Sequence, residues 1–127
     1  MSRVLVVDDE KTIRDQFGEF LAKWGVDVVT VGSLVQAEAE IVSGDVGVII
    51  QDLILGGPEA EVYDFIRKRC GPGTGCEAII ITGHVGKANF RRLVDAGAYC
   101  FFKKPVDLDE LLIATWAAQQ RAELRLR

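Results

Sequence analysis

Long apolar runs, paired cysteine motifs and a strong net charge are all missing from this 127-residue sequence. No apolar run approaches the ~20 residues that a membrane-spanning helix needs. The start, MSRVLVVDDE, lacks the longer apolar region of a signal peptide. A net charge of −4 gives no general attraction to nucleic acid or to an anionic membrane. We therefore expect a cytoplasmic protein that binds neither membrane nor nucleic acid directly.

Cysteine is scarce, with Cys70, Cys76 and Cys100 as the three occurrences. An odd number without a CxxC motif argues against a disulfide framework and against a zinc site. Reduced thiols are the simpler interpretation of all three. Cys70 and Cys76 flank a glycine-rich loop, so a redox pair is the alternative at that point.

Short apolar runs alternate with amphipathic segments along the whole chain. The runs predict five strands, at Val4–Val7, Val26–Val31, Val46–Gln51, Ala78–Ile81 and Tyr99–Phe102. Because apolarity is continuous within each run, we expect strands covered on both faces, as in a parallel sheet. The segments between them have apolar residues at helical spacing; in the fourth we expect Phe90, Leu93 and Val94 to face inward. The pattern predicts one doubly wound α/β domain with right-handed crossovers.

The stretch Val46–Gly57 organises the prediction of function. Its apolar run ends in a single carboxylate, Asp52, and the chain then breaks into glycine. In an open parallel sheet, binding sites form at the carboxyl ends of the strands. The polar residues that fall at those ends are Asp8, Asp9, Asp52, Thr82 and Lys104. Each one alone is explained as a helix cap or a solvated charge, but their coincidence at one edge predicts a site.

The chemistry of this set favours a metal-assisted phosphoryl site. Three neighbouring carboxylates repel one another unless a cation joins them. Oxygen ligands on a wet rim favour Mg²⁺, which takes one or two carboxylates together with a phosphoryl oxygen. Lys104 adds a positive charge and Thr82 adds a hydroxyl donor. Phosphoryl transfer depends mostly on positioning and charge neutralisation, and a carboxylate nucleophile can form an aspartyl-phosphate.

The sequence resembles the receiver domain of two-component response regulators over essentially its whole length. The matching stretches are VLVVDDE at 4–10, IIQDLIL at 49–55, IIITGH at 79–84 and GAYCFFKKPVDLDELL at 97–112. The resemblance implies a flavodoxin-like (βα)5 domain over residues 1–120, with a five-stranded parallel sheet in the order 2-1-3-4-5. Residues 121–127 would be the end of the last helix or the start of a linker to a further domain.

The resemblance also implies how the domain signals. Asp52 matches the phosphoacceptor, Lys104 the lysine that contacts the phosphate, Thr82 the switch hydroxyl and Phe101 the switch aromatic. Lys104–Pro105 matches a bond that is usually cis. Asp52 would take a phosphoryl group from the phosphohistidine of a sensor histidine kinase or histidine phosphotransfer protein. Such a domain is no enzyme for an outside substrate, although it catalyses its own phosphorylation and slow dephosphorylation.

A Mg²⁺ ion and its ligands follow from the same resemblance. Asp9 matches the direct ligand, Asp8 the residue that holds metal-bound water, and Asp52 contributes an oxygen. Ile54 would contribute its backbone carbonyl. Ile54 and His84 border the phosphoryl position, so they are candidates to tune the access of attacking water and hence the lifetime of the phosphate.

The family's output implies the remaining partners. Phosphorylation would change the surface of the fourth helix, fifth strand and fifth helix. That surface would act on a fused or separate output domain, or form a homodimer.

Three functions other than that of a phosphoacceptor are compatible with parts of the sequence. Gly56 and Ala60 depart from the proline and glycine usual at those positions, which favours an interaction module that works without phosphorylation. A Mg²⁺-dependent phosphatase would need a general acid two residues after Asp52, and Ile54 cannot serve. The segment GPGTGC at 71–76 only partly echoes a nucleotide-binding glycine motif, and no P-loop is present.

Overall fold

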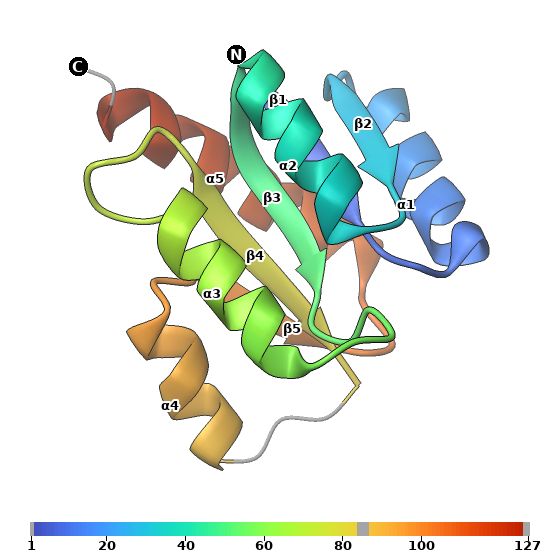
Figure 1. The fold of residues 1–127 in the computed structure, drawn as a ribbon. Coiled ribbons are helices and arrows are strands. Elements are labelled where there is room, and N and C mark those ends of the chain that lie inside the picture. Colours follow the sequence, from blue (N-terminus) through green and yellow to red (C-terminus); the bar gives the residue numbers. More distant parts are fainter. Residues whose placement is uncertain (1, 84–86, 126–127) are drawn as a thin grey trace.

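The computed structural model describes residues 2–83 and 87–125, which form a single parallel sheet with helices on both faces (Figure 1). The strands are β1 (Arg3–Val7), β2 (Val28–Val31), β3 (Val46–Asp52), β4 (Glu77–Thr82) and β5 (Cys100–Lys103). The helices are α1 (Lys11–Lys23), α2 (Leu34–Ser43), α3 (Glu59–Arg69), α4 (Lys87–Asp95) and α5 (Leu108–Arg125). The strand order is β2-β1-β3-β4-β5, and every pairing is parallel. The predicted α/β fold and strand order are confirmed.

The core has two parts, one on each face of the sheet. On one face Ile49 packs with residues from α2, α3 and α4, and on the other Ile50 packs with residues from α1 and α5. Both isoleucines are almost completely buried. Burying such a side chain contributes roughly 1.5–3 kcal/mol. Because both faces are covered, the central strands carry continuous apolar runs instead of an alternating pattern.

The start of α5 is fixed by a side-chain cap close to the carboxyl edge of the sheet. The Asp107 carboxylate accepts hydrogen bonds from the backbone N–H groups of Asp109, at 2.9 Å, and Glu110, at 3.1 Å. A cap of this kind contributes about 1 kcal/mol to helix stability. It anchors the loop that follows Lys104. The helix itself continues to Arg125.

The prediction for the apolar side of α4 was right for one residue and wrong for two. Leu93 is buried, but Phe90 is 48% exposed and Val94 is 55% exposed. The helix lies beside β5, the last strand of the sheet, and Phe90 and Val94 line a hollow with Phe101 there. Helical spacing identified the apolar stripe, but it could not show how little of the sheet lies beneath it.

No helix in the described part of the chain is long and apolar enough to cross a membrane.

Candidate functional site

The strand order brings the acidic residues together at the carboxyl edge of the sheet. Val7 at the end of β1 pairs with Gln51 of β3, so the next residues along each strand, Asp8 and Asp52, become neighbours. The order of strands reverses between β1 and β3, because β2 lies on one side and β4 on the other. Such a switch point is where open α/β sheets form binding sites.

Three carboxylates converge at this point. Oxygen atoms of Asp8, Asp9 and Asp52 all lie within 4.8 Å of one another. Asp8 is 2% exposed and Asp52 is 5% exposed, whereas Asp9 faces solvent. We call these three residues the acidic cluster.

The backbone fixes one oxygen of each buried carboxylate. Asp8 Oδ1 accepts a hydrogen bond from the Glu10 N–H at 2.9 Å, and Asp52 Oδ1 accepts one from the Ile54 N–H at 3.1 Å. Asp8 Oδ2 is buried and has no hydrogen-bond partner among the described residues. Burying a carboxylate oxygen without a hydrogen bond is energetically unfavourable unless a cation lies next to it. The donor set therefore fits a hard divalent cation, which prefers oxygen ligands.

Lys104 supplies a positive charge to the acidic cluster. Its Nζ lies 3.2 Å from Asp52 Oδ2 and 3.8 Å from Asp8 Oδ2. Partial burial is the largest single influence on the pKa of Lys104 and lowers it, but the charge and hydrogen bond of Asp52, together with the charges of Asp8 and Glu10, raise it, so the net shift is upward. Burial is also the main cause that raises the pKa of Asp8 to about 6, opposed by the Glu10 hydrogen bond and assisted by Asp52. One ammonium cannot balance three ionised carboxylates, so negative charge remains for a further cation.

The ends of β4 and β5 bring Thr82 and Phe101 near this edge. Thr82 is the buried last residue of β4, and its carbonyl accepts a hydrogen bond from the Lys104 N–H at 2.8 Å. Phe101 on β5 is partly buried and packs edge to face against Phe90, with ring centroids 5.4 Å apart. The Lys104–Pro105 peptide bond is cis, as the resemblance implied.

The two departures from the family pattern fit the local backbone. Gly56 has a φ of +77°, a conformation that glycine adopts freely and proline cannot. A Cβ placed on Gly56 would lie 3.9 Å from Asp9 Oδ2, so this turn borders the acidic cluster. Ala60 is the second residue of α3, where alanine favours the helix more than glycine does. The loop therefore follows a path that requires Gly56 and extends the helix through Ala60.

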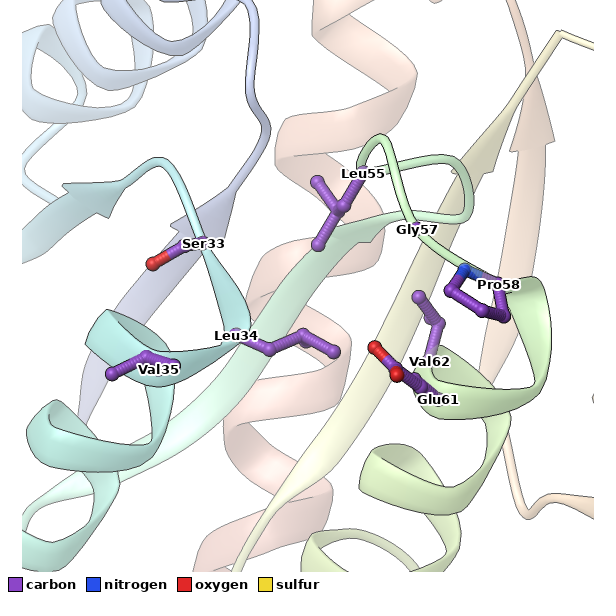
Figure 2. Close-up of a pocket in the computed structure, with 8 residues that line it drawn as sticks. All are labelled: Ser33, Leu34, Val35, Leu55, Gly57, Pro58, Glu61 and Val62. Carbon is purple, nitrogen blue, oxygen red and sulfur yellow. The ribbon is translucent and has the colours of Figure 1, made fainter.

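A shallow pocket of about 190 Å³ lies on the far side of this loop, between the starts of α2 and α3. Figure 2 shows Leu34, Leu55 and Val62 pointing toward the space between the two helices, whereas Val35 points away. No member of the acidic cluster lines this pocket. It is a mainly apolar hollow separate from the candidate site.

The structure brings most of the predicted residues to one edge. Ile54 contributes its N–H to Asp52, and its side chain is 54% exposed on the rim. His84 lies outside the described residues. Sequence reasoning missed a groove of about 420 Å³ beside Lys104, lined by Ile13, Gln16, Phe17, Lys104, Pro105 and Val106. Ile13 and Phe17, which line it, stand at helical spacing in the segment between the first two predicted strands, and that spacing was the available signal.

Comparison with known proteins decides the family. The family model described as response regulator receiver domain matches residues 4–115. The chain belongs to the response regulator receiver domain family. It is 30% identical over 126 residues to the two-component response regulator PprB of Pseudomonas aeruginosa, which covers 98% of this chain and 46% of that protein.

Solved receiver domains share both fold and length with this one. The response regulator receiver domain protein from Clostridium thermocellum superimposes with a TM-score of 0.83 at 26% identity, covering 98% of each chain. The beryllofluoride-activated NtrC4 receiver domain dimer gives a TM-score of 0.83 at 30% identity, covering 96% of this chain and 99% of that one.

The curated relatives are longer proteins. This receiver domain spans 46% of PprB, 26% of an NtrX-like response regulator of Rickettsia typhi and 50% of a probable transcriptional regulatory protein of Sinorhizobium fredii. The similarity therefore concerns the receiver portion of those proteins.

Proposed function

We propose that this receiver domain accepts a phosphoryl group on Asp52 from a phosphohistidine, with Mg²⁺ in the acidic cluster. The observation that carries the proposal is the convergence of three carboxylates within 4.8 Å, with Lys104 Nζ 3.2 Å from Asp52. The Asp52 carboxylate attacks phosphorus, the phosphorus–nitrogen bond breaks, and the released imidazole nitrogen takes a proton. The product is an acyl phosphate on Asp52.

Each residue at the edge has a part in this transfer. Asp9 and Asp52, with the backbone carbonyl of Ile54, would hold the metal directly, and Asp8 would hold its bound water. When bound, Mg²⁺ neutralises charge on the carboxylates and on the phosphoryl oxygens. Lys104 contacts a phosphoryl oxygen, because its flexible side chain already reaches the Asp52 carboxylate.

The hydroxyl of Thr82 completes the proposed phosphate contacts and starts the switch. Thr82 moves toward the phosphoryl group, and Phe101 turns inward to fill the space that Thr82 leaves. Phosphorylation is then a population shift between two states, driven by a local change of charge. The transfer and a slow hydrolysis of the acyl phosphate are the reactions that this signalling domain catalyses on itself.

The surface formed by α4, β5 and α5 is the proposed output face. It exposes large apolar side chains, namely Phe90, Val94, Ile113 and Trp116. A hollow of about 560 Å³ lies between β5 and α5 on the same face. Exposed apolar surface of this extent suits a protein partner. We propose that it contacts a fused or separate output domain, or a second copy of the domain.

The proposed phosphodonor is a sensor histidine kinase or a histidine phosphotransfer protein, and the proposed location of the domain is the cytoplasm. The groove between α1 and the residues after β5 is a suitable docking place. It is lined by Ile13, Phe17, Pro105 and Val106, and it ends at Lys104. A donor seated there would present its phosphohistidine next to the Asp52 carboxylate.

Acetyl phosphate tests the proposal without a partner protein. Wild type incubated with acetyl phosphate and Mg²⁺ should gain the mass of one phosphoryl group, and chelation of Mg²⁺ should prevent the gain. Asp52→Asn should gain nothing, because the carboxamide cannot form the acyl phosphate. Equal modification of wild type and Asp52→Asn would show that Asp52 is not the acceptor.

A receiver-like interaction module that works without phosphorylation is the second candidate. The departures at Gly56 and Ala60, next to Asp52, are the observation in its favour. Under that function, wild type would gain no phosphoryl group from either acetyl phosphate or a kinase.

A further inference from the structure

Two cysteine side chains lie against each other at the end of the sheet remote from Asp52. The Sγ atoms of Cys70 and Cys76 are 3.6 Å apart, and both residues are 5% exposed and reduced. Cys70 ends α3 and Cys76 directly precedes β4. Figure 1 shows the α3–β4 loop at the opposite end of the sheet from the β3–α3 loop. The proposed phosphorylation uses neither thiol.

The loop between the two cysteines holds its ends together by hydrogen bonds. The Gly71 N–H donates to the Cys76 carbonyl at 3.1 Å. The Thr74 hydroxyl donates to the Gly71 carbonyl at 2.8 Å and accepts from the Cys76 N–H at 3.2 Å. These bonds hold the two ends of the loop next to each other, so a disulfide would need only a further approach of the two sulfur atoms. They would close from 3.6 Å to the ~2.05 Å of a disulfide.

The third cysteine provides an internal contrast. Cys100 is half-buried on β5, on the proposed output face, and burial raises the pKa of its thiol to about 11. Among the described residues, the hydrogen bonds between sulfur atoms join Cys70 to Cys76 and do not involve Cys100. A mixed disulfide at Cys100 would therefore have no neighbouring thiol to resolve it, whereas one at Cys70 or Cys76 would have a second sulfur 3.6 Å away.

We propose that Cys70 and Cys76 form a reversible intramolecular disulfide when the folded domain meets a small-molecule disulfide such as oxidised glutathione. One thiolate attacks the small disulfide, forms a mixed disulfide and expels one small thiolate, which takes up a proton. The second cysteine then attacks the protein sulfur of that mixed disulfide and expels the second small thiolate. The two protein thiols lose two electrons and two protons, and the small disulfide gains both.

The disulfide would cross-link the two ends of the α3–β4 loop, which lies next to the turn between α4 and β5. A Cβ placed on Gly97, in the turn between α4 and β5, would lie 3.9 Å from the Cys70 carbonyl oxygen and 3.9 Å from the Gly71 Cα. The thiol pair therefore gives this domain a redox-sensitive site in contact with the α4–β5 turn.

Mass spectrometry of the wild-type chain tests the proposal directly. Folded protein is incubated with oxidised glutathione, remaining thiols are alkylated, and the chain is cleaved with trypsin. Cleavage after Arg69 and Lys87 releases both cysteines in one peptide, residues 70–87. That peptide should be lighter by two hydrogen atoms and carry no alkyl group, whereas Cys100 should carry an alkyl group or glutathione and no link to another cysteine. Reduction with dithiothreitol should restore two thiols.

Matched variants separate the pair from the lone thiol. Cys100→Ser should oxidise as fast as wild type, and Cys76→Ser should stop at a glutathione adduct on Cys70. The proposal is overturned if the folded wild type keeps all three thiols, if it carries glutathione that the second cysteine never displaces, or if a disulfide forms through Cys100. Oxidation that requires enough urea to unfold the chain would also overturn it. The wild-type peptide decides the question even if Cys76→Ser does not fold.

Discussion

Two buried carboxylates stand at opposite ends of the sheet, and each faces a cationic side chain. At the carboxyl edge Asp52 is 5% exposed and lies 3.2 Å from Lys104 Nζ. At the amino edge Glu77 is 1% exposed and lies 3.4 Å from Arg121 Nε. Considered as isolated ion pairs, the two are nearly equivalent.

Their surroundings differ in charge balance. Asp52 shares its cation with Asp8, and Asp9 adds a third carboxylate within 4.8 Å. Glu77 meets a guanidinium that also lies over the Tyr99 ring, with the Arg121 Cζ 5.6 Å from the ring centroid. A buried ion pair alone is therefore no sign of function. The informative feature is unbalanced negative charge at a strand end, because that charge favours the binding of a further cation.

Loss of Lys104 should have the largest kinetic effect at the carboxyl edge. Lys104→Ala removes the charge that faces Asp52 and the proposed contact to the phosphoryl group. Loss of one such preorganised donor costs about 10²–10³ in rate. We expect phosphorylation by acetyl phosphate to slow by about a hundredfold, measured as the rate of mass gain. Lys103→Ala is the matched control, since Lys103 is the exposed neighbour and should leave the rate unchanged.

Neutralising one carboxylate at each edge should change stability with opposite signs. Asp8→Asn removes a buried charge that burial and Asp52 disfavour, so without metal it should stabilise the domain by on the order of 2 kcal/mol at pH 7.5. Glu77→Gln removes an attraction to Arg121 and should destabilise by roughly 1 kcal/mol. Urea unfolding measures both. A loss of stability in both variants would contradict the difference drawn between the edges.

The raised pKa of Asp8 also makes the stability of the domain depend on pH. The pKa of Asp8 is about 6 in the folded state against 3.8 in the unfolded chain, so the folded state holds the proton more tightly. The contribution of Asp8 to stability should therefore fall as pH rises from about 4 to about 6 and stay low above that. Without metal, the wild type should show this fall relative to Asp8→Asn over that window.

Loss of the Asp9 carboxylate should weaken Mg²⁺ binding by a smaller factor than the loss of Lys104 slows phosphorylation. Outer-sphere partners of metal ligands typically contribute 10- to 100-fold in affinity, so loss of Asp9, the proposed direct ligand, should cost roughly tenfold or more. Asp9→Asn should weaken Mg²⁺ binding by that factor in isothermal calorimetry. Asp15→Asn makes the same change of net charge at an exposed site paired with Lys11. If both variants weaken binding equally, the effect is general electrostatics and the acidic cluster is not the metal site.

The rim of the site should show the smallest effect. Ile54 is 54% exposed beside Asp52, and its removal should admit water to the acyl phosphate. We expect Ile54→Ala to dephosphorylate a few-fold faster than wild type, measured as loss of the added mass after removal of acetyl phosphate. His84→Ala tests the other tuning residue that the sequence suggested. Equal rates for a variant and wild type would remove that residue from the tuning set.

The parts of the fold that depend on side-chain burial could be predicted from the sequence. A run such as Val46–Gln51 is apolar at every position but one because helices cover both faces of β3. The burial of this strand on both faces could therefore be predicted from the run alone. The mistake at Phe90 and Val94 arose because a helical stripe does not show how much sheet lies under it. Only the position of α4 beside β5 could show that.

The candidate site divides in the same way. Strand ends are local features, so the sequence located Asp8, Asp9 and Asp52 at one edge, and their oxygens do converge. The left-handed turn at Gly56 and the contact between Cys70 and Cys76 depend on how two loops close. Loop closure is set by backbone hydrogen bonds, which no pattern of residues in the sequence predicts. The conformations of these two loops could therefore be seen only in the structure.

The residue that carries the phosphoryl group is the most direct test of the proposed function. Wild type treated with acetyl phosphate and Mg²⁺ can be reduced with borohydride, which converts an aspartyl-phosphate to homoserine, and then sequenced by peptide mass spectrometry. We expect homoserine at position 52, and none when Mg²⁺ is chelated. Homoserine at another aspartate, or equal labelling of Asp52 without a divalent cation, would contradict it.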